Sequence, residues 1–241
     1  MPAPWARLPA GVRTGISLRR VVDALTGDRA AHRSRVTEPW RHLGAPVPAS
    51  RPAAVLVSMF EEEGEARVVL TVRSDRLRSH QGEVAFPGGR LEGDEGVVEA
   101  ALREAFEEVG LRPDLVTVVA QLTAMPTISS DTVMTPVVAT LGTRPSLTAN
   151  PGEVERVFDV ALSELAAEGV FHEEWWSVPG RAGAQRFPDG EFPDGEFPDG
   201  EFPVWFFEVA GETVWGATAR ILVELICLVL GVDVPPTLRG P

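Results

Sequence analysis

The 241-residue sequence contains a single cysteine, Cys227, and neither lysine nor tyrosine. One cysteine excludes a disulfide within the chain and argues against a cysteine-based zinc site. The apolar run at 221–232 contains Glu224 and falls short of the roughly 20 residues that a membrane-spanning helix requires. The N-terminal residues lack the apolar segment of a signal peptide. We therefore expect a cytoplasmic protein in which Cys227 is a buried thiol.

Positive charge is also scarce. The sequence has 35 acidic residues against 22 arginines, which gives a formal net charge of −13. Such a chain repels phosphate backbones and anionic lipids, so we expect neither nucleic-acid nor membrane binding. A small phosphate-bearing substrate stays compatible with this charge, because a bound metal ion reverses the local field.

The most informative segment covers residues 89–111. Its second half carries apolar residues at roughly helical spacing, and Gly110 stands where a helix end favours positive φ. Glu104, Glu107 and Glu108 lie three and four residues apart, so they are expected on one helix face, where like charges repel. A divalent cation would offset this repulsion, because hard cations bind carboxylate oxygens. The apolar set consists of Ala100, Ala101, Leu102, Ala105, Phe106 and Val109.

Taken alone, an acidic helix of this kind is more simply a solvated face with Arg103 as an ion-pair partner. The surrounding residues favour a functional interpretation, because a Pro-Gly-Gly turn at 87–89 precedes the helix. Glu95 stands near the helix start, where a carboxylate suits the positive end of the helix dipole. The complete spacing resembles the Nudix box, which is matched at Gly89, Glu95, Arg103, Glu104, Glu107, Glu108, Gly110 and Leu111.

This resemblance to Nudix hydrolases implies an α/β fold, the Nudix α/β/α sandwich with a mixed β-sheet, and often a homodimer. It also implies hydrolysis of a phosphoanhydride by water, with Mg²⁺ or Mn²⁺ as the cofactor. The metal ligands would then be Glu104, Glu107 and Glu108. Catalytic roles are expected for Glu107 and Glu108, with Arg103 orienting the glutamates. Gly88 and Gly89 would border the substrate and allow a tight turn beside the metal.

The preceding segment carries a second resemblance, to the coenzyme A diphosphatase branch. It would make coenzyme A or a derivative the substrate, with 3′,5′-ADP and 4′-phosphopantetheine species as products. Arg73, Arg78 and His80 would bind the substrate, since guanidinium groups match phosphate oxygens. Alternatively, the two arginines neutralise nearby acids such as Asp75 and Glu83, and His80 is a structural hydrogen-bonding group. The residues that carry this resemblance are Arg73, Leu77, Arg78, His80, Gly82, Glu83 and the Phe-Pro-Gly-Gly run at 86–89.

One segment departs from that branch. Ser130, Asp131 and Thr132 stand where the branch usually has a Ser-Gly-aromatic element. A Nudix diphosphatase for another nucleotide, such as NADH, an ADP-sugar or a nucleoside triphosphate, is therefore the alternative. A non-catalytic nucleotide-sensing domain is less favoured, because every box glutamate is present. Glu153 or Glu155 could reach the metal site, although a solvated loop acid is the simpler expectation for either.

The sequence suggests three parts: an N-terminal arm at 1–52, the Nudix hydrolase domain at 53–234 and a tail at 235–241. A short helix capped by Ser17 is expected at 17–25, and a long final helix at 214–230. Phe-Pro-Asp-Gly-Glu occurs three times from residue 187, so 187–203 is expected to form an exposed loop without regular structure. Strands are expected at 53–60, 67–72, 115–122, 134–141, 171–178 and 204–209.

Overall fold

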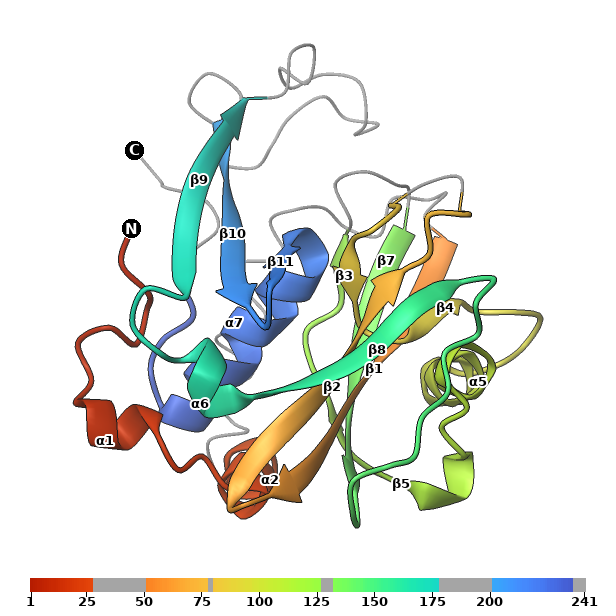
Figure 1. Ribbon diagram of the computed structural model, residues 1–241, viewed down its shortest axis with the longest axis horizontal. Helices are drawn as coiled ribbons and strands as arrows, with labels where there is room; N and C mark the ends of the chain where they lie inside the picture. The colour runs from red at the N-terminus through yellow and green to blue at the C-terminus, as the bar shows by residue number, and fades with distance from the viewer. Residues whose placement is uncertain (28–50, 78–79, 127–131, 178–200, 236–241) are drawn as a thin grey trace.

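A mixed β-sheet forms the centre of the protein in its computed structural model (Figure 1). β1 (Arg51–Glu62) and β2 (Glu65–Arg73) form an antiparallel hairpin. β7 (Thr132–Leu141) lies parallel to β1, and β5 (Val116–Gln121) runs antiparallel to β7. The structure describes residues 1–27, 51–77, 80–126, 132–177 and 201–235.

Four shorter or peripheral strands complete this sheet. β3 (Val84–Ala85) and β8 (Val154–Ala161) both pair with β2. β4 (Gly88–Arg90) pairs with β1, and β6 (Met125–Pro126) pairs with β7. The order across the sheet is therefore β3-β2-β1-β7-β5, with the other strands attached to this path.

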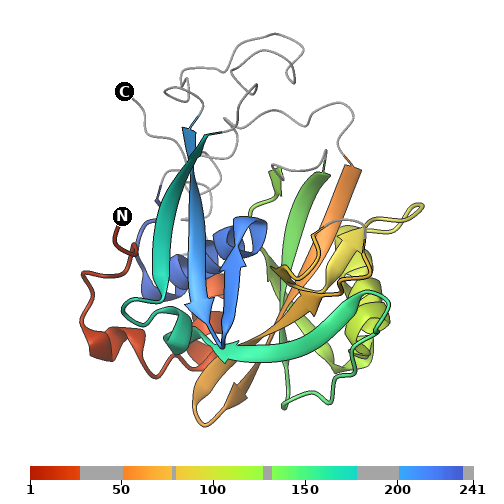
Figure 2. The ribbon, with the colours of Figure 1, turned by 45° about the horizontal axis from the view of Figure 1, so that its top comes forward.

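A second sheet of three antiparallel strands lies beside the first, as Figure 2 also shows. It consists of β9 (Phe171–Ser177), β10 (Glu201–Val209) and β11 (Glu212–Trp215), with β10 in the middle. The chain enters it from the short helix α6 (Leu162–Leu165), which follows β8. β11 comes close to β3 and so joins the small sheet to the edge of the large one.

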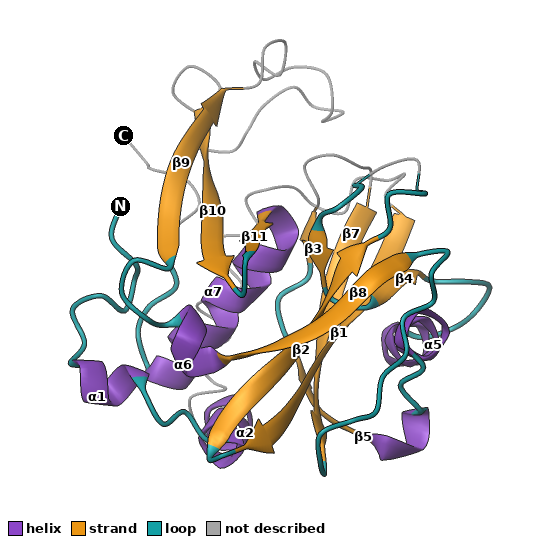
Figure 3. Cartoon of the chain, viewed as in Figure 1, coloured by secondary structure: helices purple, strands orange, loops and turns teal. Residues whose placement is uncertain are grey.

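Helices cover both faces of the large sheet (Figure 3). α5 (Val97–Val109) packs on one face against Ala54 and Leu56 of β1. α7 (Gly216–Leu230) and α2 (Leu18–Thr26) belong to the apolar cluster on the other face, with Val55 and Val57. Alternate residues of β1 thus contact opposite helix layers, which is why its apolar run is continuous. This arrangement confirms the expected α/β/α sandwich.

The N-terminal segment is part of the core. It contains α1 (Ala10–Arg13) and α2, whose start is capped by the Ser17 hydroxyl accepting the Arg20 N–H, as the sequence predicted. Trp5 is fully buried. Its ring stacks on Phe207 of β10 with 6.2 Å between the ring centroids, and it meets Phe171 edge-on at 5.7 Å. Residues 1–27 therefore pack on the rest of the domain, although the boundary at residue 52 stays a prediction.

The expected strands are all present, with small shifts at their ends, and three details of the prediction are wrong. The final helix was expected from residue 214, but Val214 and Trp215 belong to β11. Gly216, with φ of 63°, makes the turn between that strand and α7. Phe106 was placed in the apolar helix set, yet it is 52% exposed. The loop expected at 187–203 lies outside the described residues as far as 200, and 201–203 begin strand β10 instead. Within the described ranges, no helix is long and apolar enough to cross a membrane.

Replacing Trp5 tests whether the N-terminal segment stabilises the domain. Trp5→Ala should lower the free energy of unfolding by about 3 to 5 kcal/mol, as is usual for a large buried aromatic side chain. Phe106→Ala is the control, because that ring is exposed, and it should change stability by less than about 1 kcal/mol. Urea unfolding followed by circular dichroism measures both. Equal small effects would mean that residues 1–27 are a detachable arm.

Candidate active site

Helix α5 places two glutamates, Glu104 and Glu108, at the site. Its buried face contains Ala101 and Ala105, and Glu108 lies at the next helical position on that face. Only 4% of Glu108 is exposed. Because this inward position goes to Glu108, Phe106 falls on the solvent side of the helix. Gly110 then ends the helix with φ of 69°, as predicted.

Strand β4 brings two glycines against these glutamates. Gly88 and Gly89 pair with Val55 and Ala54 of β1, so the turn before α5 lies on the sheet. The Gly88 N–H donates to Glu108 Oε2 at 3.1 Å. A β-carbon on Gly89 would collide with the Glu104 carboxylate, so only glycine permits this approach.

A third carboxylate comes from the loop before β8. The Asn150 N–H donates to the Glu108 carbonyl at 2.8 Å, and the Ser74 N–H donates to the Glu153 carbonyl at 2.9 Å. These backbone bonds fix the loop between α5 and the end of β2. As a result, carboxylate oxygens of Glu104, Glu108 and Glu153 lie within 4.8 Å of one another. We call these three residues the glutamate triad.

Arg103 organises the acids around the triad. Its Nε and Nη2 donate to both oxygens of Glu95, at 3.0 and 2.8 Å. Its Nη1 donates to Glu104 at 3.1 Å and to Glu107 at 3.0 Å. Glu107 is therefore held toward Arg103, with its side chain 52% exposed, and lies outside the triad. Arg103 shares its charge among three carboxylates and orients one triad member.

Burial and mutual repulsion perturb the triad electrostatically. Burial raises the pKa of Glu108 to about 7, and the charges of Glu104 and Glu153 add to this increase. Burial also raises the pKa of Glu104, against the opposing effect of Arg103. In contrast, the hydrogen bond from Arg103 lowers the pKa of Glu95. Proton uptake relieves the triad only in part, whereas a divalent cation would compensate all three carboxylates.

The donor set of the triad fits a hard divalent cation. All three groups are carboxylates, which Mg²⁺ and Mn²⁺ prefer over nitrogen or sulfur ligands. Two of them come from one helix and are held by backbone and guanidinium donors, so they converge before any ion binds. A helix face that was simply solvated would not bury Glu108 to this extent.

Arg73 is one of the three cations expected to bind substrate. It ends β2, and its charge acts on Glu108 of the triad. Its Nε is buried and has no hydrogen-bond partner among the residues that the structure describes. His80 instead forms a 2.9 Å contact with Glu83 through Nδ1, which agrees with the alternative of a structural hydrogen-bonding group. Arg78 lies outside the described residues.

Glu153, for which a solvated loop acid was the simpler expectation, lies in the triad. The signal for it was weak: an acid after a Pro-Gly turn at 151–152, in a segment similar to the coenzyme A branch. Glu155, two residues on, is in β8 and outside the triad. The sequence alone does not distinguish Glu153 from Glu155. The fold does, because it brings 150–153 to the end of α5.

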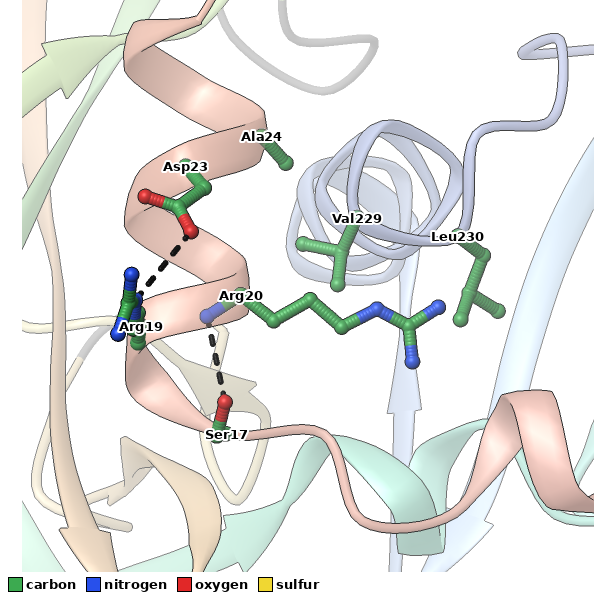
Figure 4. A pocket seen from close by; sticks show the side chains of 7 residues that line it. All are labelled: Ser17, Arg19, Arg20, Asp23, Ala24, Val229 and Leu230. Atoms are coloured by element: carbon green, nitrogen blue, oxygen red, sulfur yellow. Dashed lines mark hydrogen bonds and ion pairs between the residues drawn. The ribbon is translucent and has the colours of Figure 1, made fainter.

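A hollow elsewhere on the protein is separate from the triad. It lies between α2 and α7 and has a volume of about 480 Å³. Figure 4 shows the Arg20 side chain extending across it toward Val229 and Leu230, while Arg19 and Asp23 pair on α2 at 3.7 Å. α2 and α7 cover the sheet face opposite α5, so this hollow shares no residue with the triad.

Comparison with known proteins identifies the family. Residues 49–177 match the NUDIX domain. The chain belongs to the NUDIX domain family. The matched residues include β1, the two glycines, the whole of α5 and all three triad glutamates. The resemblance inferred from eight box positions is therefore confirmed.

Three relatives illustrate the range of similarity. The uncharacterized Nudix hydrolase NudL of Photorhabdus laumondii is 34% identical over 177 residues, covering 73% of this chain and 83% of that protein. Nudix hydrolase 3 of Caenorhabditis elegans is 38% identical over 120 residues, covering 48% and 50%. The peroxisomal coenzyme A diphosphatase NUDT7 of Mus musculus is 38% identical over 133 residues, covering 55% and 56%. The chain thus spans about half the length of the last two proteins.

The pKa of Glu108 gives a pH prediction for the metal-free protein. Between its unfolded value near 4.5 and about 7, the folded state binds a proton that the unfolded state releases, so stability falls as pH rises. Glu108→Gln should remove this dependence and stabilise the metal-free protein at pH 8 by about 1 to 3 kcal/mol. Thermal unfolding at pH 5 and pH 8 measures the effect.

The same unfolding experiment with added Mg²⁺ separates the triad from Glu107. Mg²⁺ should raise the unfolding temperature of the wild type and of Glu107→Gln, but not of Glu108→Gln. Loss of the Mg²⁺ effect in Glu107→Gln would instead make Glu107 a ligand, as the sequence analysis expected.

The two glycines should respond differently to alanine. In Gly89→Ala the new methyl meets the mobile end of Glu104, so the fold should remain while metal affinity falls at least about tenfold. In Gly88→Ala it meets the backbone of β1, with Val55 Cα at 2.6 Å, so stability should fall by several kcal/mol. Calorimetric titration with Mn²⁺ and urea unfolding would reveal the contrast. A folded Gly89→Ala protein with unchanged metal affinity would contradict it.

Proposed function

We propose that the protein is a divalent-metal-dependent Nudix hydrolase that cleaves the diphosphate of coenzyme A or a derivative. The products would be 3′,5′-ADP and a 4′-phosphopantetheine species. The observation that carries the proposal is the glutamate triad, three converging carboxylates on which the charge of Arg73 acts. Family membership agrees with this chemistry, since the relatives are named Nudix hydrolases.

Glu104, Glu108 and Glu153 would hold Mg²⁺ or Mn²⁺. When bound, such an ion neutralises diphosphate charge and lowers the pKa of a coordinated water. Arg103 keeps Glu104 in place through the bond at 3.1 Å and is itself fixed by Glu95. The Gly88 N–H directs one oxygen of Glu108, which leaves the other available to a ligand.

Two further residues would act on the reaction directly. Arg73 has an Nε donor without a partner among the described residues, and a charge-assisted bond to a diphosphate oxygen would satisfy it. Glu107 is exposed and is held by Arg103. Among the described residues of α5, it is the carboxylate next to the triad that does not belong to the triad. We assign Glu107 to proton transfer with water, the catalytic role that the box resemblance suggested.

The choice of coenzyme A rests on two supports. The segment from Arg73 to Gly89 is similar to the coenzyme A diphosphatase branch, and a mouse relative at 38% identity carries the name coenzyme A diphosphatase. That relative is also named peroxisomal, which is a property of that protein. A cytoplasmic location and a homodimer stay predictions from the sequence.

A substrate panel tests the proposal. With Mg²⁺ or Mn²⁺, the protein should release 3′,5′-ADP from coenzyme A at least about tenfold faster than it hydrolyses NADH, ADP-ribose or dGTP. Chelation of the metal should abolish the activity. Brisk turnover of another diphosphate with little cleavage of coenzyme A would overturn the substrate while preserving the metal-dependent chemistry. No turnover of any diphosphate would favour a nucleotide-sensing domain.

Arg73 can be tested in the same assay. Arg73→Ala should lower kcat/KM for coenzyme A by about 10- to 100-fold, the range expected for losing a charge-assisted hydrogen bond. Arg76→Ala is the control, because Arg76 lies three residues further along the chain, in the loop after β2, and is exposed. Equal effects of the two substitutions would point to general electrostatic attraction instead of a specific contact.

A further inference from the structure

The small sheet carries a row of stacked aromatic rings on one face. His172 lies 4.9 Å from Phe206 with the rings almost parallel, and Trp215 stacks near Phe206 at 6.3 Å. Trp176 continues the row, with its ring 5.4 Å from Trp215 and 5.9 Å from Phe206. We call these four residues the aromatic row. They come from all three strands, β9, β10 and β11.

The opposite face of the same sheet packs against the core. Phe171 and Phe207 are directly paired across β9 and β10, and both contact the buried Trp5. Since side chains alternate along a strand, His172, Phe206 and Trp215 belong to the other face. The aromatic row therefore makes no contribution to the packing around Trp5. Its outermost member, Trp176, keeps 38% of its surface exposed.

The row approaches the active site through its Trp215 end. β11, which ends at Trp215, lies close to β3, as Figures 1 and 2 both show. The Thr218 hydroxyl donates to the Val84 carbonyl of β3 at 3.0 Å and so fixes the start of α7 against that strand. Gly88, which binds Glu108, follows Val84 by four residues, a reach of at most about 14 Å. The segment from β3 to β4 thus connects the Trp215 end of the row to the triad.

The charge around Trp176 favours an uncharged ligand group. The Trp176 Nε1–H donates to Glu174 Oε2 at 2.8 Å, which orients the indole. Glu174 also lies 3.7 Å from His172. A carboxylate at this place repels phosphate, but it accepts hydrogen bonds from the amino group of a base. The diphosphate end of a substrate therefore belongs at the triad, and its base end at the row.

We propose that the aromatic row, through the exposed ring of Trp176, stacks the adenine base of the nucleotide substrate. This inference rests on the proposed function, because the diphosphate at the triad sets which end of the substrate reaches the row. Aromatic side chains stack on bases through their flat faces, and rings already held by neighbours lose little entropy on binding. Trp176 would thus be a specificity-determining residue that contributes to binding and not to bond cleavage.

Trp175 provides a matched control. It is adjacent to Trp176 in β9, it is 37% exposed, and its Nε1–H also donates to the glutamate two residues earlier, Glu173. It differs in pointing to the other face of the strand. Trp175→Ala and Trp176→Ala therefore remove the same kind of side chain with similar exposure. Any difference between their ligand affinities shows which face of the small sheet binds the ligand.

The experiment is calorimetric titration of the full chain, with Mg²⁺, against 3′,5′-ADP and 4′-phosphopantetheine separately. Trp176→Ala should weaken 3′,5′-ADP binding about tenfold, as expected for losing one base stack, and leave 4′-phosphopantetheine within about twofold. Trp175→Ala should leave both affinities unchanged, and Trp176→Phe should restore most of the loss.

Several results would overturn the inference. Equal effects of the two alanine variants, or a loss confined to 4′-phosphopantetheine, would exclude base stacking on the row. A change of oligomeric state in Trp176→Ala, measured by sedimentation, would make the row an interface between copies of the chain. Hydrolysis by the wild type is assayed separately. If no diphosphate is cleaved but Trp176 still governs 3′,5′-ADP affinity, the proposed function fails and the base site stands.

Discussion

The burial of Glu108 is the constraint on which the site depends. A carboxylate that is 4% exposed, beside two others, is unfavourable unless donors and a cation compensate it. The protein supplies a backbone N–H from Gly88 and the nearby charge of Arg73, and it distributes Arg103 among the surrounding acids. The Gly88 N–H and the bond from Arg103 to the Arg90 carbonyl both require β4 to lie against α5. The requirement for two consecutive glycines follows from this packing.

The two faces of the large sheet differ in their function: one carries the triad and the other most of the apolar core. The α5 side carries the triad, and the buried apolar residues of α5 are mostly alanines, which lets the helix lie close to β1 and β7. The α7 side contains the larger apolar cluster, in which the N-terminal segment and the small sheet take part. Trp5 ties these last two elements together. The stability of the fold is thus concentrated on the face away from the acids, where repulsion within the triad has little effect.

The sequence predicted those features that depend on local spacing. The helix at α5, its end at Gly110, the strands and the Ser17 cap follow from periodicity and from single residue types. Features that depend on the fold could not be read in this way. Glu107 and Glu108 are neighbours in sequence, but the helix turns one toward Arg103 and buries the other. Glu153 reaches the triad only because its loop is bonded to both α5 and β2.

The pairing of β1 with β7 bears on how the protein folds. These strands are parallel, and Arg51 lies opposite Thr132, so the pairing must close a long loop of chain. Such long-range parallel contacts form slowly, because loop closure precedes the gain from packing. The triad spans the same interval, from Glu104 to Glu153. Metal affinity should therefore develop only in the last phase of refolding, and a metal-sensitive signal would report completion of the sheet.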